Sequence, residues 1–315
     1  MTRVNRLLIL SRNAKRYAAL IRKQAFTDLH ILACSRPAEV QADVARCNII
    51  LGEPALVAEV VDRARRLQWV QSTFAGVEAL VGGRVRTDYQ LTNVKNVFGP
   101  LMSEYVLGYL LALERHFFET YENQKRRLWQ NKRYRNLRNV VVGICGVGSI
   151  GRHIARTAKC FGMTVWGLRR SGKSVSEVDR LFTGSDFYAF LSEPDYVVVC
   201  LPHTPQTFHL FDAAAFREMK DTAVLINVAR GAVVSETALV EALRSGDLRG
   251  AVLDVFEHEP LSCASPLWRM PNTWITPHNS GYSFAESIVS IFVDNYHRFS
   301  SGRALQYQVD VARGY

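Results

Sequence analysis

The chain has no apolar run that approaches the roughly 20 residues of a membrane-spanning helix, which argues against a membrane protein. Its first apolar stretch, Leu7 to Leu10, is too short for a signal peptide and predicts a strand instead. The 6 cysteines include no closely spaced pair, so we expect reduced thiols in the core, with neither a disulfide framework nor a metal site. Together these absences favour the cytoplasm.

Length and composition are those of a folded protein with more than one domain. Hydrophobic residues make up 48% of the 315 residues and charged residues 22%, and this length is comfortable for two domains. The net charge is +10, with a basic cluster between Lys125 and Arg138 that also holds Trp129 and Tyr134. Such a cluster is compatible with a nucleic-acid surface, but a solvated helix end or a field that attracts anionic ligands is the commoner explanation, which we favour.

The strongest local signal is a glycine-rich turn between an apolar strand, Val140 to Ile144, and a helix-like segment, His153 to Cys160. The spacing Gly-x-Gly-x-x-Gly allows a tight turn, a close approach of the backbone to a pyrophosphate, and close packing of helix on strand. The phosphates would then face the N–H groups of a helix N-terminus. The sequence therefore predicts a dinucleotide site. Its turn residues are Gly146, Gly148, Ser149, Ile150 and Gly151.

The second predicted strand of this region, Met163 to Gly167, is followed by basic and hydroxyl side chains. NAD sites usually carry an acid at this point, which binds the ribose hydroxyls. Here Arg169, Arg170, Ser171 and Lys173 offer donors that suit a 2′-phosphate, although a solvated basic loop is the alternative. We therefore expect NADP(H) to be preferred, with NAD(H) possible.

Strand-like and helix-like segments alternate through most of the chain, which predicts an α/β fold with parallel, doubly wound sheets. A long helix is expected from Pro100. In the first hundred residues the expected strands are Leu7 to Leu10, Asn48 to Leu51 and Trp69 to Ser72, and the expected helices are Asn13 to Ala25 and Pro54 to Arg65. The later strands are Val140 to Ile144, Met163 to Gly167, Tyr196 to Cys200, Ala223 to Asn227, Ala251 to Asp254 and Trp274 to Thr276, with a helix at Glu236 to Arg244.

Three groups capable of chemistry follow the ends of predicted strands. Arg230 follows the strand that ends at Asn227, Glu259 lies beyond Asp254, and His278 follows Thr276-Pro277. Ligands of doubly wound sheets bind outside the carboxyl ends of the strands, so these side chains are candidates for one active site.

The ordered motifs resemble those of the D-isomer-specific 2-hydroxyacid dehydrogenases, and most of all the glyoxylate/hydroxypyruvate reductases. The resemblance rests on the glycine motif, Asn227-Val228-Ala229-Arg230-Gly231, Asp254-Val255-Phe256-x-x-Glu259-Pro260, Thr276-Pro277-His278, Phe74-Ala75-Gly76-Val77-Glu78, Ser103-Glu104-Tyr105-Val106 and the ending Val309 to Tyr315. It implies two Rossmann-like domains, a substrate domain of residues 1–98 and 283–315 and an NAD(P)-binding domain of residues 99–282. It also implies an active site in the cleft between them, and a homodimer.

The resemblance further implies how the residues act on a small 2-oxoacid. His278 would donate the proton, Glu259 would orient and charge the imidazole, and Arg230 would hold the substrate carboxylate. Asp254 would contact the nicotinamide amide. Arg230 and His278 would border both ligands, Phe74, Ala75 and Gly76 would bind the substrate, and the remaining cofactor contacts would come from Leu201, Pro202, Thr204, Val228 and Ala229.

A nucleotide-sensing binding protein, like the corepressors of this fold, is the alternative to a 2-oxoacid reductase. The intact trio of Arg230, Glu259 and His278 favours the enzyme, because a sensor has no need of a proton donor. Glu259 also argues against a formate dehydrogenase, whose branch pairs its histidine with glutamine. Asn279 and Ser280 depart from the apolar and small residues common in the family, which leaves the polarity of the substrate pocket open.

Overall fold

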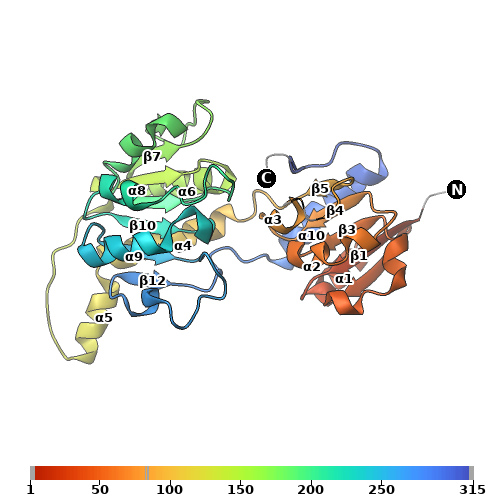
Figure 1. Cartoon of the computed structure of the whole chain (residues 1–315), viewed down its shortest axis with the longest axis horizontal. Helices are drawn as coiled ribbons and strands as arrows, with labels where there is room; N and C mark the ends of the chain where they lie inside the picture. Colours follow the sequence, from red (N-terminus) through yellow and green to blue (C-terminus); the bar gives the residue numbers. More distant parts are fainter. Residues whose placement is uncertain (1–3, 82, 84, 312–315) are drawn as a thin grey trace. The chain divides into compact units, whose positions relative to one another are not determined.

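The computed structural model describes residues 4–81, 83 and 85–311, so the end of the C-terminal motif, residues 312–315, lies outside the described part. The chain divides into two compact units, Met1–Val97 with Ser283–Tyr315, and Phe98–Tyr282. Each unit is built on a parallel sheet flanked by helices (Figure 1), which confirms the predicted α/β class with two Rossmann-like domains.

The described residues of the first unit form five strands in the order β2-β1-β3-β4-β5, all paired in parallel. Its central strands are almost entirely buried, and helix α10 covers the sheet by stacking Phe292 on Trp69 with 5.2 Å between ring centroids. Asn295 of the same helix donates to Gln71 Oε1 at 3.1 Å. The elements are β1 (Asn5–Leu10), α1 (Ala14–Arg22), β2 (Leu29–Cys34), β3 (Ile49–Gly52), α2 (Pro54–Ala58), β4 (Trp69–Ser72), α3 (Glu78–Val81), β5 (Gln90–Thr92) and α10 (Ala285–Ser300).

The second unit has seven parallel strands in the order β12-β11-β10-β9-β6-β7-β8, with apolar clusters on both faces. The order changes direction between β6 and β9, the switch point beside which doubly wound sheets bind ligands. The elements are α4 (Gly99–Glu114), α5 (Phe117–Lys125), β6 (Val141–Cys145), α6 (Ser149–Cys160), β7 (Thr164–Leu168), β8 (Arg180–Phe182), α7 (Phe187–Leu191), β9 (Tyr196–Val199), α8 (Ala213–Glu218), β10 (Val224–Asn227), α9 (Glu236–Ser245), β11 (Gly250–Leu253) and β12 (Thr273–Ile275).

All nine predicted strands are present, most within one residue of their predicted ends, whereas β2, β5 and β8 were not predicted. The helix predicted for Pro54 to Arg65 is wrong in its second half, where the chain forms a turn and then the 3₁₀ segment Val61–Arg63. The expectation of core thiols holds for Cys34, Cys47 and Cys145 but is wrong for Cys160 and Cys263, which are exposed. Among the described residues, no helix is long and apolar enough to cross a membrane.

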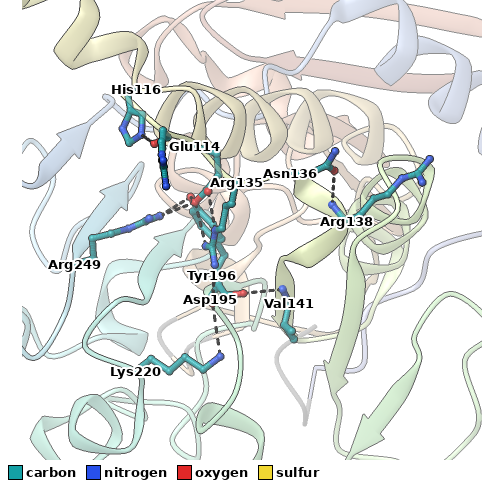
Figure 2. Close-up of polar contacts among 11 residues, drawn as sticks. Glu114, His116, Arg135, Asn136, Arg138, Val141, Asp195, Tyr196, Lys220 and Arg249 are labelled. Carbon is teal, nitrogen blue, oxygen red and sulfur yellow. Dashed lines mark hydrogen bonds and ion pairs between the residues drawn. The ribbon is translucent and has the colours of Figure 1, made fainter. Parts of the chain in front are cut away.

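Residues 116–137, which we call the arm, lead from α4 through α5 and back to β6. Figure 2 shows how its return segment is held: Arg135 donates to both oxygens of Glu114 at 2.7 and 3.1 Å and reaches Asp195 at 3.1 Å. Glu114 is only 4% exposed and also accepts hydrogen bonds from Tyr196 and Arg249. One arginine of the basic cluster is therefore committed to two buried carboxylates inside the unit, which fixes the base of the arm.

Candidate active site

The glycine turn has the shape that the sequence predicts. Gly146 adopts φ +108°, and a Cβ there would lie 2.7 Å from the Cys200 carbonyl oxygen, so both backbone and space require glycine. A Cβ on Gly151 would lie 2.2 Å from the Gly146 oxygen, whereas one on Gly148 would meet nothing within 4 Å. Ser149 and Ile150 begin helix α6 directly after this open position. The turn thus leaves room for a ligand at a helix N-terminus.

The basic loop after β7 carries no carboxylate before Glu177. Arg169 is half-buried and its N–H donates to the Phe182 carbonyl at 3.1 Å, while Arg170 is exposed. Glu177 itself is bonded by Arg152 at 2.9 Å and by Arg156 at 3.3 Å. The hydrogen bond from Arg152 is the main reason that the pKa of the Glu177 carboxyl falls to about 2. The first acid after the loop is therefore already paired with arginines of α6.

The segment after β9 lies against the glycine turn, since the Cys200 carbonyl is the group that a Cβ on Gly146 would strike. Thr207 Oγ1 donates to the Pro202 carbonyl at 2.7 Å, and the Thr204 N–H donates to Thr207 Oγ1 at 2.8 Å. These bonds close the turn that presents Leu201, Pro202 and Thr204 beside the glycine motif.

The turn that carries Arg230 is shaped by Asn227, a buried residue at the end of β10. The Asn227 side chain accepts from the Ala229 N–H at 3.1 Å and donates to the Arg230 carbonyl at 3.2 Å. A Cβ on Gly231 would lie 1.8 Å from the Phe256 carbonyl carbon. Glycine at position 231 is therefore required for the turn that contains Val228 and Arg230 to pack against the segment that leads to Glu259.

His278 and Glu259 form a direct pair: Nδ1 of the imidazole lies 2.7 Å from Glu259 Oε2. The second carboxylate oxygen, Oε1, accepts the Phe256 N–H at 3.0 Å, which orients the carboxylate. The His278 side chain is 51% exposed, so one side of the ring is open to a small molecule while the other is tied to the chain.

His278 and Glu259 set each other's charge, and the positive charge of Arg230 acts on both. The hydrogen bond to Glu259 raises the pKa of His278, against burial and the nearby positive charge of Arg230. Burial would raise the pKa of Glu259, but hydrogen bonds from His278 and Phe256 outweigh it and the pKa is lowered. The site therefore favours an imidazolium beside a carboxylate, which is the charge state of a general acid.

Asp254, at the end of β11, is completely buried. Its carboxylate accepts four hydrogen bonds from the segment around His278: from the Thr276 hydroxyl, the Asn279 N–H, and the N–H and hydroxyl of Ser280. The predicted contact of Asp254 with a nicotinamide amide stays a prediction. Ser280, one of the two departures from the family pattern, is buried and bonded to Asp254.

In the first unit, Phe74, Ala75 and Gly76 form the loop after β4. Ser72 Oγ donates to the Phe74 carbonyl at 2.8 Å and accepts the Phe74 N–H at 2.9 Å. The Asn93 amide donates to the Ala75 carbonyl at 2.9 Å. The loop is held at the carboxyl end of that unit's sheet, the edge at which such sheets bind ligands.

Sequence reasoning did not identify Asn227 or Thr276 as residues that shape the site. Both lie inside motifs that it used for other purposes, and their hydrogen bonds are visible only once β10, β11 and β12 stand side by side. The one available signal was a polar residue directly at the end of a continuous apolar strand.

Comparison with known proteins places this geometry in a family. The family model of the D-isomer specific 2-hydroxyacid dehydrogenase NAD-binding domain matches residues 107–280. A glyoxylate/hydroxypyruvate reductase A from Yersinia enterocolitica is 33% identical over 68% of each chain.

Among solved structures, a D-isomer specific 2-hydroxyacid dehydrogenase family protein from Aeromonas salmonicida is similar with a TM-score of 0.93 and 44% identity over 98% of this chain and 99% of that one. An NADPH-dependent glyoxylate/hydroxypyruvate reductase from Sinorhizobium meliloti, in complex with NADP and sulfate, has a TM-score of 0.89 and 30% identity over 99% and 100%. The chain therefore belongs to the D-isomer specific 2-hydroxyacid dehydrogenases, which are NAD(P)-dependent oxidoreductases.

The charge coupling in the site is directly measurable by NMR titration of His278. We expect an imidazole pKa above the ordinary value near 6.5, and a fall of that pKa in Glu259→Gln, which keeps the shape of the side chain but removes its charge. His30, an exposed histidine of the other unit, is the internal reference and should not move. An unchanged His278 pKa in Glu259→Gln would contradict the coupling.

Proposed function

We propose that this chain reduces small 2-oxoacids of the glyoxylate and hydroxypyruvate type to D-2-hydroxyacids, with NADPH as the preferred cofactor. The observation that carries this proposal is the His278–Glu259 pair at 2.7 Å, placed in the same unit as the glycine turn and within electrostatic influence of Arg230. Relatives that carry the name glyoxylate/hydroxypyruvate reductase support the substrate class.

Each residue of the trio has a chemical task in this reaction. His278 donates a proton from Nε2 to the carbonyl oxygen of the substrate, and Glu259 keeps the ring oriented and charged through Nδ1. Arg230 binds the substrate carboxylate with its planar, permanently charged guanidinium and polarises the carbonyl group. The cofactor, when bound, supplies the hydride.

The cofactor residues are proposed from the local geometry of the second unit, residues 99–282. The open Gly148 position at the start of α6 suits a pyrophosphate, and the neutralised Glu177 leaves a positive loop for a 2′-phosphate. The structure of the Sinorhizobium meliloti reductase with NADP supports this choice. The proposed contacts are Gly146, Gly148, Ser149, Ile150, Gly151, Arg169, Arg170, Ser171, Leu201, Pro202, Thr204, Val228, Ala229, Arg230 and His278.

We assign substrate binding to residues 1–98 and 283–315, in which Phe74, Ala75 and Gly76 lie at the carboxyl end of β4. The bonded loop described above holds the backbone N–H groups of this segment in a fixed arrangement, as an anion-binding loop requires.

The proposed reaction is tested by following NADPH absorbance with glyoxylate and with hydroxypyruvate. We expect turnover in the unmodified enzyme, and a kcat lowered by roughly 10²–10⁴ in His278→Ala, the range for loss of a positioned general acid. His30→Ala is the matched control and should retain wild-type kcat. NADPH binding without any turnover would favour a nucleotide sensor, and a His278→Ala enzyme with full kcat would contradict the proton-donor role.

Cofactor preference is tested at the loop after β7. Two charge-assisted contacts to a 2′-phosphate predict a preference for NADPH over NADH on the order of 10²–10⁴ in kcat/KM. Arg169→Asp should reduce or reverse it by weakening NADPH binding, whereas Arg217→Asp, the same charge change on an exposed position of α8, should leave the ratio unchanged. Equal kcat/KM values for both cofactors in the unmodified enzyme would refute the assignment.

We also propose that the chain forms a homodimer through the arm. The arm exposes large apolar side chains: Phe117 (56%), Phe118 (41%), Tyr121 (58%), Leu128 (53%), Trp129 (102%) and Tyr134 (58%). Such a cluster of exposed apolar side chains marks an interaction surface, and a two-fold dimer lets each copy cover the same patch on the other. Arg135 holds the base of the arm to buried carboxylates, so the surface is presented in a defined position.

Light scattering after gel filtration should give twice the chain mass of 35.6 kDa. Replacing Tyr121 and Trp129 together by Ser should shift the mass toward one chain, because the dimer then has less apolar surface to bury. Tyr188→Ser, at a position of similar exposure on α7, should leave the dimer intact. A monomeric unmodified protein, or a dimer unaffected by the double substitution, would contradict this interface.

A further inference from the structure

The segment that carries His278 is attached to a single buried carboxylate. The Asp254 side chain accepts the Thr276 hydroxyl at 2.5 Å and the Asn279 N–H at 2.9 Å on Oδ1, and the Ser280 N–H at 3.0 Å and hydroxyl at 2.5 Å on Oδ2. The backbone carbonyl of the same aspartate accepts the His278 N–H at 2.8 Å. Asp254 thus binds the chain on both sides of the histidine.

The backbone at His278 needs such support. Its φ is +51°, in the left-handed region that residues with a Cβ seldom adopt, at a cost of order 1–3 kcal/mol. Because Thr276 and Asn279 are both fixed to Asp254, the residues between them have little freedom to relax into a commoner conformation. That conformation aims the imidazole at Glu259.

A second hydroxyl extends this arrangement to helix α4. The Tyr105 hydroxyl lies 2.7 Å from Thr276 Oγ1. Thr276 has only one hydroxyl proton, and it donates that proton to Asp254 Oδ1. Tyr105 is therefore the donor to Thr276, and the bonds run in one direction from Tyr105 through Thr276 to Asp254.

The same helix contacts the far end of the segment. Met102, one turn before Tyr105 on α4, has its Sδ 3.4 Å from Ser280 Oγ. A Cβ on Gly281 would lie 3.3 Å from the methyl carbon of Met102, so the chain after His278 also rests on this helix. Residues 276–281 are therefore contacted both by helix α4 and by Asp254.

We propose that Tyr105 and Thr276 act, through Asp254, as positioning residues for His278. They touch neither substrate nor reacting atoms in this assignment. They hold the backbone of the histidine so that its ring meets Glu259 at hydrogen-bond distance. The inference rests on the proposed role of His278 as proton donor.

The experiment removes one hydroxyl at a time. Thr276→Val keeps the size of the side chain but leaves Asp254 Oδ1 with one donor fewer and Tyr105 without its acceptor, and we expect kcat to fall roughly tenfold to hundredfold. Thr276→Ser restores the hydroxyl and should return kcat to about half of wild type or more, which separates positioning from a folding defect. Tyr105→Phe should lower kcat less, by roughly threefold to tenfold, because the bond from Thr276 to Asp254 remains.

The decisive measurement is whether the effect of Thr276→Val on kcat depends on the presence of His278. In a His278→Ala background, Thr276→Val should change the residual kcat by less than about twofold, because a residue that acts only through His278 has nothing left to position. KM for NADPH should stay within about twofold of wild type in both backgrounds. In the enzyme with His278 intact, Thr276→Val should lower the imidazole pKa measured by NMR, since the bond to Glu259 is loosened.

The outcomes separate the two proposals. Full kcat in Thr276→Val, or an equal loss with and without His278, overturns the positioning role and leaves the proposed reaction standing. A raised KM for NADPH with unchanged kcat also overturns it, and assigns the Asp254 network to cofactor binding instead. Full kcat in His278→Ala overturns the proposed function, and the NMR shift in Thr276→Val still reports whether the network positions the ring.

Discussion

The parallel alignment of β10, β11 and β12 is the constraint on which the candidate site depends. Each strand is short, β10 and β11 are buried and β12 at the sheet edge is partly buried, and the ladder brings Asn227 opposite Leu253, and Leu253 opposite Ile275. Residues that are tens of positions apart in the sequence therefore leave the sheet at one edge, which is why Arg230, Glu259 and His278 come under one another's electrostatic influence. Loss of this register would displace all three side chains at once.

The two carboxylates of the site, Asp254 and Glu259, differ in burial and in their hydrogen-bond partners. Asp254 is fully buried and saturated with donors from its own chain, so it stabilises backbone geometry. Glu259 is partly exposed and is bonded to the imidazole itself, so it adjusts charge and orientation of the ring. The donors around Asp254 satisfy its buried oxygens, whereas Glu259 is bonded by the imidazole and by the Phe256 N–H. Asp254 and Glu259, which both follow β11, thus support His278 in different ways: Asp254 fixes the backbone, and Glu259 orients the ring.

Much of this arrangement was predictable from sequence because it follows from strong local signals. Short apolar segments identified nine strands, the glycine spacing identified the turn before α6, and strand exits identified the trio. The three unpredicted strands lack these signals: β5 and β8 have three residues each, and β2 is an edge strand with His30 and other partly exposed positions. Their strand character comes from pairing with a neighbour, which no local window contains.

The hydrogen-bond network around Asp254 could not be predicted from the sequence, for a related reason. Tyr105 and Thr276 are 171 positions apart, and nothing in either segment indicates that one hydroxyl faces the other. Both belong to motifs whose resemblance was recognised, yet a resemblance names residues without naming the bonds between them. The bonds follow from the packing of α4 beside β12, which is itself a consequence of the order of the sheet.

Helix α4 contacts both the segment that carries His278 and the base of the arm. Tyr105, near the middle of the helix, bonds to the segment that carries His278, and Glu114, the last residue of the helix, receives Arg135 of the arm about 13 Å further along. Because a close-packed interior transmits strain, the arm and the segment that carries His278 are coupled through this helix. The residues that hold the arm in place are thereby part of the same framework that holds His278.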